Sequence, residues 1–148
     1  MLKFDIQNRR YVGNKFKLKN WLQENILSNT KGNIFFDVFS GTGVISQIFS
    51  KNYNKITIND FLYSNNIIYK AFFEQVPFNE EKLITIIESF NKIQTSNLKD
   101  NYFNLMFANK FFGMNDSKKI GYIREQVQEM YTNYDITEKE YNILLASL

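Results

Sequence analysis

The sequence of 148 residues contains no cysteine and no histidine, and its only proline is Pro77. Without cysteine the chain has no disulfide framework, no thiolate zinc site and no cysteine nucleophile. Without histidine it also lacks the commonest general base and metal ligand. These absences exclude many classes of enzyme, and we expect no metal site.

Long apolar runs are absent as well. Residues 1–5 lack the apolar core of a signal peptide, and no uninterrupted apolar stretch is long enough to span a bilayer. We therefore expect a cytoplasmic protein without a membrane partner. An excess of charge of one sign is also missing, because 18 basic residues face 15 acidic ones. The net charge of +3 permits a nucleic-acid partner without requiring one.

The most informative stretch is an apolar run, residues 34–38, that breaks into a Gly-x-Gly turn at Gly41 and Gly43. Such a run is typical of a strand that is buried on both faces of a parallel sheet. Apolar residues after the turn recur on one helical face, and residues 55–60 then alternate between apolar and polar. The pattern predicts one βαβ unit, about residues 33–60, with two parallel strands.

Helical periodicity marks residues 15–27 and dominates the second half of the sequence, where no further βα alternation is found. Asp116 or Ser117 can cap one helix, and Thr137 with Glu140 forms a capping box that opens another. The predicted fold class is α/β with a mainly helical C-terminal half. The apolar positions predicted to face inward in this half are Ile67, Ile68, Ala71, Phe72, Leu83, Ile84, Ile86, Ile87, Phe90, Ile120, Ile123, Val127, Met130, Tyr141, Leu144, Leu145 and Leu148.

The chain ends inside an apolar helical run, residues 145–148, without a glycine cap or a polar fade-out. We interpret this end as the truncation of a longer protein; the alternative is a terminal helix that packs on the core. A truncated sheet leaves an open strand edge and bare apolar faces, so self-association is expected.

The residues around the glycine turn suggest a nucleoside ligand. Glycines at the carboxyl end of a strand let the backbone turn sharply and let a ligand approach. Asp60, 17 residues after Gly43, ends the next predicted strand, where its carboxylate can accept hydrogen bonds from both hydroxyls of a ribose. Ser46 replaces the third glycine of the dinucleotide fingerprint, which favours a nucleoside without phosphates. Asp37 suits the ammonium group of S-adenosylmethionine and would repel a phosphate; alternatively, loop amides satisfy this carboxylate.

Three stretches of the sequence resemble motifs of one enzyme family. Residues 10–15, RYVGNK, resemble a leading aromatic-x-Gly-x-Lys motif, and residues 37–43, DVFSGTG, an acid-x-Phe-x-Gly-x-Gly motif. Residues 59–60, Asn-Asp, resemble the acidic end of the family's second strand. Together they resemble the N-terminal part of a Dam-like, D12-class, site-specific DNA adenine-N6 methyltransferase of the restriction-modification type. More loosely, residues 120–124 and 138–148 look like the helical insertion common in this class.

The resemblance implies S-adenosylmethionine as cofactor and a set of residues that hold it. Tyr11 and Lys15 would line the pocket, and residues 39–43 would wrap the methionine part. Asp60 would hold the ribose, and Phe61 would flank the adenine ring. The cofactor-binding residues expected in this way are Tyr11, Gly13, Lys15, Asp37, Phe39, Ser40, Gly41, Thr42, Gly43, Asp60 and Phe61.

The resemblance also implies a Rossmann-like S-adenosylmethionine-dependent methyltransferase fold, here incomplete. Residues 1–62 would form the cofactor-binding α/β part, and residues 63–148 a helical insertion that can include the start of the target-recognition region. Family members act on double-stranded DNA and place an Asp-Pro-Pro-Tyr type tetrapeptide after this insertion, where it binds a flipped-out adenine. Because Pro77 is the only proline, this tetrapeptide is missing. No catalytic residue is expected in this chain, and the chain alone is expected to be inactive.

Two other functions stay open at this point. The chain can be a non-catalytic or split-enzyme subunit whose partner polypeptide supplies the missing half. It can also belong to another nucleotide-binding enzyme, such as a dehydrogenase, although the missing third glycine argues against that function.

The aromatic and basic residues 102–113 have two interpretations as well. They can contact DNA, or Phe103, Phe107 and Phe111 can form an apolar helical stripe in the core. The core stripe is the favoured interpretation.

Overall fold

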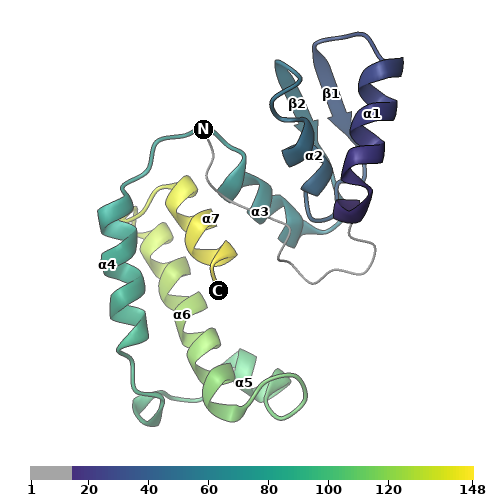
Figure 1. Cartoon of the computed structure of the whole chain (residues 1–148). Coiled ribbons are helices and arrows are strands. Elements are labelled where there is room, and N and C mark those ends of the chain that lie inside the picture. Colours follow the sequence, from purple (N-terminus) through teal and green to yellow (C-terminus); the bar gives the residue numbers. More distant parts are fainter. Residues whose placement is uncertain (1–14) are drawn as a thin grey trace. The chain divides into compact units, whose positions relative to one another are not determined.

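The computed structural model describes residues 15–148. The chain divides into two compact units, of which the first ends at Glu74 and the second is Gln75–Leu148 (Figure 1). The described chain is an α/β protein that is mostly helical and has one small parallel sheet. Within residues 15–148, no helix is both long and apolar enough to cross a lipid bilayer.

The first unit contains the predicted βαβ arrangement. The two strands are parallel, with Ile34 opposite Lys55 and Asp37 opposite Ile58. The prediction of a βαβ unit over residues 33–60 is thereby confirmed, and the carboxyl ends of both strands meet at the same edge of the sheet. The elements of this unit are η2 (Lys15–Leu18), α1 (Lys19–Asn29), β1 (Ile34–Asp37), α2 (Val44–Phe49), β2 (Lys55–Ile58) and α3 (Tyr63–Phe72).

The two faces of this sheet differ in burial. On one face Phe35 of β1 stacks on Phe49 of α2, with ring centroids 4.9 Å apart, and the ring of Tyr53 lies 5.2 Å from that of Phe35. On the other face Ile34 is 67% exposed and Phe36 is 57% exposed. The prediction that this strand is buried on both faces is wrong, because the described sheet has only two strands and α2 packs on the Phe35 face.

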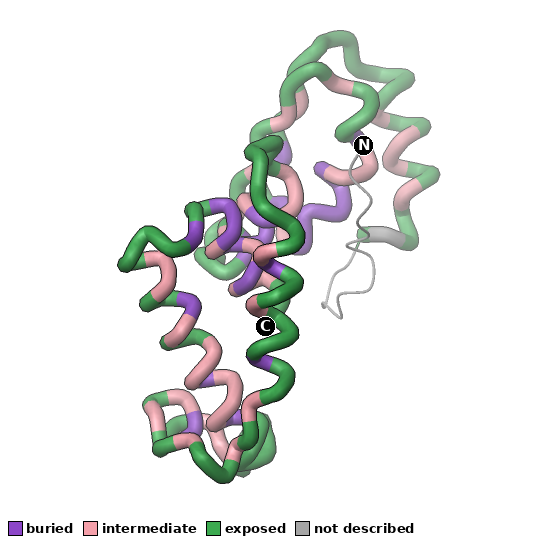
Figure 2. Tube along the Cα trace, turned by 90° about the vertical axis from the view of Figure 1, so that its left-hand side faces the viewer, coloured by how far each residue is buried: buried purple, intermediate pink, exposed green. Residues whose placement is uncertain are grey.

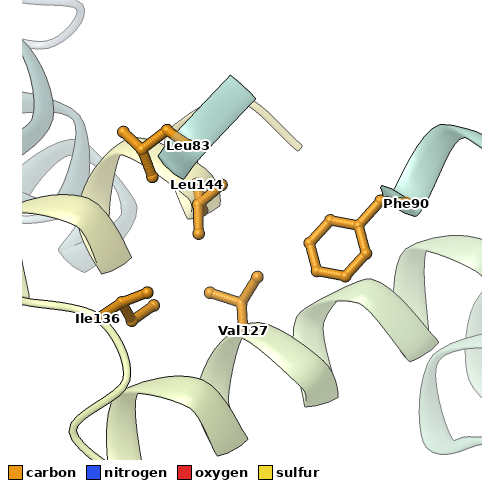
Figure 3. Packing of buried hydrophobic residues seen from close by; sticks show 5 residues of the cluster. All are labelled: Leu83, Phe90, Val127, Ile136 and Leu144. Atoms are coloured by element: carbon orange, nitrogen blue, oxygen red, sulfur yellow. The ribbon is translucent and has the colours of Figure 1, made fainter. Parts of the chain in front are cut away.

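The second unit is built from helices around a small apolar core. Its helices are α4 (Glu80–Asn91), η3 (Thr95–Asn97), α5 (Tyr102–Phe107), α6 (Met114–Thr132) and α7 (Glu138–Ala146). Buried positions recur at intervals along these helices, as amphipathic packing requires (Figure 2). The core side chains, each at most 7% exposed, are Leu83, Phe90, Val127, Ile136 and Leu144 (Figure 3).

Some positions predicted to face inward are exposed instead. Ile84 and Ile87 of α4 are 49% and 38% exposed, and Leu148, beyond the end of α7, is 47% exposed. The inward face of α4 is narrower than predicted, because only side chains near the line of Leu83 and Phe90 reach the core.

The start of α6 also differs from the prediction. The helix begins at Met114 with Gly113 in the N-cap position and without a side-chain cap, whereas the sequence predicts Asp116 or Ser117 as the cap. Ser117 lies inside the helix, and its hydroxyl donates to Gly113 O at 2.6 Å. A serine can bond to the preceding turn as well as cap a helix, so its presence does not identify the first helical residue.

Helix α5 is shorter than the predicted aromatic stripe. It ends at Phe107, and the chain turns at Asn109, whose φ is 59°. The ring of Phe103 lies 4.9 Å from that of Phe107 and 5.5 Å from that of Phe112, whereas Phe111 is 76% exposed. The predicted core stripe of three phenylalanines is therefore wrong at Phe111, because the helix stops before that residue.

Glu140 links the beginnings of α4 and α7. The predicted capping box is confirmed, since Glu140 N donates to Thr137 Oγ1 at 3.2 Å and Thr137 N donates to Glu140 Oε2 at 2.9 Å. The carboxylate also accepts from Asn79 N at 3.0 Å and from Lys82 Nζ at 3.2 Å. Burial disfavours its charged form, but the N–H groups of Thr137 and Asn79 and the Lys82 ammonium outweigh burial, so the pKa of Glu140 lies below its ordinary value.

We predict that the substitution Glu140→Gln destabilises the second unit by about 2 kcal/mol at neutral pH, because Asn79, Lys82 and Thr137 lose the charged acceptor that the buried Glu140 provides. Since the folded-state pKa lies below the unfolded one, the stabilisation is complete above the unfolded pKa and is lost as pH falls through the folded pKa. Chemical unfolding of the whole chain, followed by circular dichroism from neutral to acidic pH, should therefore show a smaller acid destabilisation for the variant. Glu125→Gln, exposed on α6, is the matched control. Equal acid destabilisation in Glu140→Gln and wild type would contradict this role.

Candidate functional site

The turn that follows β1 requires glycine at two positions. Gly41 has a φ of 55° and Gly43 a φ of 81°, in the left-handed region that residues with a Cβ rarely adopt. A Cβ on Gly43 would also lie 3.0 Å from Cε2 of Phe73 and 3.3 Å from Cε1 of Tyr69. The Gly-x-Gly spacing thus has a backbone reason at both positions and a packing reason at the second.

The glycine turn and Asp60 are in direct contact. Asp60 Oδ2 accepts a hydrogen bond from Gly41 N at 2.8 Å. The strand ends are also joined beyond the ladder, because Ser40 N donates to Asn59 O at 3.0 Å and Asn59 N donates to Asp37 O at 2.9 Å. This meeting of two loops at the carboxyl edge of a parallel sheet is the usual place for a ligand in α/β folds.

Three donors hold the Asp60 carboxylate. Besides Gly41 N, Leu62 N donates to Oδ1 at 3.0 Å and the Asn65 side-chain amide donates to Oδ1 at 2.9 Å. The hydrogen bonds from Leu62 and Asn65 lower the pKa of Asp60. Burial raises this pKa by a smaller amount and the hydrogen bond from Gly41 lowers it further, so the pKa lies below its ordinary value. The ionised carboxylate acts purely as an acceptor, as recognition of a hydroxyl requires.

Asp37, the last residue of β1, is only 8% exposed. Its Oδ2 accepts from Ser46 Oγ at 2.7 Å, and its backbone O accepts from Ser40 Oγ at 2.8 Å. The donor that the structure shows for this carboxylate is therefore a hydroxyl of α2 and not a loop amide. Ser46, which replaces the third glycine of the fingerprint, is completely buried and ties α2 to β1.

Two aromatic side chains beside the turn are largely exposed. Phe39 is 79% exposed and Phe61 is 98% exposed. A ligand bound at the glycine turn would lie within reach of such rings. By contrast, Ser40 and Thr42 are buried, so their side chains belong to the turn itself.

The first predicted motif is mostly outside the described residues. Tyr11 and Gly13 lie outside them, and Lys15 is exposed at the start of η2. The described part of the predicted site therefore consists of Asp37, residues 39–43 and residues 60–61, together with this lysine.

Sequence reasoning missed two polar residues of α3 that contact the site. Asn65, only 2% exposed, donates to Asp60, and Tyr69 Oη donates to Gly41 O at 2.6 Å. The sequence pattern that could have identified them is the spacing of four between Asn65 and Tyr69, which places both on the helical face that also carries the apolar Ile68.

The turn offers little to a phosphate or a metal ion. In dinucleotide-binding turns, free backbone N–H groups bind the pyrophosphate. Here the N–H groups of Ser40, Gly41 and Gly43 donate to Asn59 O, to Asp60 Oδ2 and to Ser40 O. Among residues 15–148, no three acidic side chains gather as metal ligands would.

The family model of the D12 class N6 adenine-specific DNA methyltransferases matches residues 11–148. The chain belongs to this class. The match covers most of the first motif, the glycine turn and the acidic end of β2, and it confirms the resemblance noted in the sequence.

Curated relatives of this D12-class chain are type II methyltransferases of greater length. M.FokI of Planomicrobium okeanokoites is 32% identical over 153 residues, which cover 94% of this chain and 24% of that protein. M.CviAII of Paramecium bursaria Chlorella virus 1 is 30% identical, and M.NlaIII of Neisseria lactamica is 26% identical; each match covers 93% of this chain and 43% of the relative. The chain thus spans less than half the length of these relatives. No solved structure matches it significantly.

For this D12-class turn we predict that Gly43→Ala destabilises the first unit by about 2–3 kcal/mol, from left-handed strain and the displaced ring of Phe73. Chemical unfolding followed by the fluorescence of Trp21 measures the change. Gly113→Ala is the control, because its φ is −61° and its Cβ would meet only the Asp116 carboxylate, at 3.5 Å. Because Gly113 belongs to the second unit, the unfolding followed by Trp21 should match wild type. Wild-type stability of Gly43→Ala would contradict the described turn.

Proposed function

We propose that this chain is the S-adenosylmethionine-binding part of a site-specific DNA methyltransferase that acts on adenine N6 in a restriction-modification system. The observation that carries the cofactor proposal is the 2.8 Å hydrogen bond between Gly41 N and Asp60 Oδ2. This bond joins the glycine turn and the acidic end of β2 into one site. Membership in the D12 class and the type II methyltransferases among the relatives support the reaction.

The adenosine end of the cofactor would lie at the acidic end of β2. Asp60 would accept a hydrogen bond from the ribose, because its carboxylate is ionised and held by Leu62 and Asn65. The exposed ring of Phe61 would cover one face of the adenine, which gives this side chain an apolar partner.

The methionine end would lie over the glycine turn, with residues 39–43 around it. Asp37 would pair with the ammonium group, because a buried carboxylate is costly without compensating partners and the hydroxyl of Ser46 bonds to only one of its oxygens. A phosphate would instead meet this carboxylate and a turn whose N–H groups are engaged. By the family resemblance, Tyr11, Gly13 and Lys15 would complete the proposed pocket.

The proposal places the βαβ unit in a Rossmann-like S-adenosylmethionine-dependent methyltransferase fold that is incomplete in this chain. Residues 1–62 would form the cofactor-binding part, and residues 63–148 the helical insertion that leads toward target recognition. The bare sheet face at Ile34 and Phe36 supports an incomplete fold, since sheets of this kind are normally covered on both faces.

When bound, the cofactor supplies a methyl group carried on a sulfonium. The residues of this chain would bind and orient it, with the carboxylate of Asp37 near the ammonium and that of Asp60 at the ribose. The Asp-Pro-Pro-Tyr tetrapeptide that binds adenine in the family is missing, because Pro77 is the only proline. Contact with double-stranded DNA and methyl transfer are therefore proposed for a complete enzyme and not for these 148 residues alone.

We predict that the 148-residue chain binds S-adenosylmethionine in a calorimetric titration. The substitution Asp60→Ala should weaken binding at least about tenfold, since a charged acceptor is lost. Asp116→Asn, in the first turn of α6, is the matched control and should bind like wild type. A wild-type chain that binds no S-adenosylmethionine would contradict the proposed function.

A second candidate function is a cofactor-binding subunit that works together with another polypeptide. The apolar sheet face favours it, because Ile34, Phe36 and Val38 are 67%, 57% and 40% exposed and lie along one strand and its continuation. Such a face associates with other apolar surfaces.

We predict that the isolated chain self-associates through this face and that Phe36→Thr reduces the association, because threonine keeps strand propensity while removing the ring. Analytical ultracentrifugation over a range of concentrations measures the change. Tyr134→Asn removes an aromatic side chain that is 94% exposed in the second unit, and it should leave the association unchanged. A monomeric wild-type chain at every concentration would contradict this prediction.

A further inference from the structure

We infer that Asn65 and Tyr69 of α3 are positioning residues for the proposed cofactor site and that they leave Asp60 able to accept one ribose hydroxyl, not two. The inference rests on the proposed function, because it concerns the same site. Neither residue belongs to the motifs that identify the family in this sequence.

Helix α3 contacts both halves of the site through one of its faces. Asn65 Nδ2 donates to Asp60 Oδ1 at 2.9 Å, and Tyr69 Oη donates to Gly41 O at 2.6 Å. Residues four apart lie on the same face of a helix, so a single rigid element holds the carboxylate after β2 and the turn after β1. Both side chains are buried, at 2% and 7% exposure, so few other rotamers are open to them.

The hydrogen bonds of Asp60 limit what it can still accept. A carboxylate has about four acceptor positions, two on each oxygen. Leu62 N and Asn65 Nδ2 occupy both positions on Oδ1, and Gly41 N occupies one on Oδ2. One position remains, on Oδ2. The two-hydroxyl recognition expected from the sequence is thereby narrowed to one hydroxyl, and the second hydroxyl is left to water.

Tyr69 acts on the other half of the site. Its hydroxyl holds the carbonyl of Gly41, the residue whose N–H donates to Asp60. The edge of one ring of the pair Tyr69 and Phe73 faces the other ring, with centroids 6.2 Å apart. The Tyr69 ring also lies beside Gly43, where a Cβ would be 3.3 Å from its Cε1. Removing only the hydroxyl therefore tests positioning while the packing of the ring is kept.

The test is calorimetric binding of S-adenosylhomocysteine and its 2′-deoxy and 3′-deoxy analogues to the full chain. With wild type, loss of one hydroxyl should weaken binding at least about tenfold, and loss of the other less than about threefold. Asn65→Leu should weaken the binding of S-adenosylhomocysteine about tenfold. It should also bring the affinities of the two deoxy analogues within about threefold of each other, because an acceptor position on Asp60 Oδ1 is freed. Tyr69→Phe should weaken all three compounds by a similar factor, and the control Tyr134→Phe should match wild type.

A double-mutant cycle of Asp60 and Asn65 distinguishes a positioning role of Asn65 from a general loss of structure. In an Asp60→Ala background, Asn65→Leu should cause no further loss of affinity, because its effect passes through the missing carboxylate. If circular dichroism shows that Asn65→Leu is unfolded, the two deoxy analogues on wild type and the Tyr69→Phe variant still decide the inference.

These binding experiments distinguish a failure of the inference about Asn65, Tyr69 and Asp60 from a failure of the proposed function. A wild-type chain that binds none of the three compounds overturns the proposed function. A wild-type chain that binds the parent compound but loses equal affinity with each deoxy analogue overturns the single-hydroxyl inference. Wild-type affinities for folded Asn65→Leu and Tyr69→Phe overturn the positioning role. In the last two cases the proposed function stands.

Discussion

The hydrogen bond from Gly41 N to Asp60 Oδ2 is the interaction on which the candidate site depends. It forms because two parallel strands end at the same edge of the sheet, which brings a glycine turn and a carboxylate together from points 19 residues apart. The surrounding polar contacts support this bond from both sides. Ser46 of α2 holds the strand end before the turn, while Asn65 and Tyr69 of α3 hold the carboxylate and the turn carbonyl.

The two units are stabilised in different ways. In the second unit, side chains from α4, α6 and α7 close on one another around Val127, and the buried carboxylate of Glu140 joins the beginnings of two helices. In the first unit α2 covers one sheet face, while Ile34 and Phe36 stay exposed on the other. The first unit therefore combines a well-bonded turn with an exposed apolar surface.

The chain carries only some of the motifs of the D12 class, and it is shorter than its relatives. The chain spans 24% to 43% of the relatives named above, and its match begins within the first predicted motif. It holds the residues proposed for the cofactor but not the double-proline tetrapeptide that would bind adenine. The proposed function therefore concerns the cofactor side of the site.

The sequence by itself determined the family, the βαβ order, the glycine turn and the capping box at Thr137, because each depends on residues close together in the chain. Only the tertiary structure decided that one face of β1 is exposed, that Phe111 is exposed, and that the Asn65 side chain donates to Asp60. Apolar periodicity reports that a side chain can be buried, but the segments that meet it in space decide whether it is. In the same way, a carboxylate is visible in the sequence, whereas the number of its acceptor positions already filled depends on donors that folding brings to it.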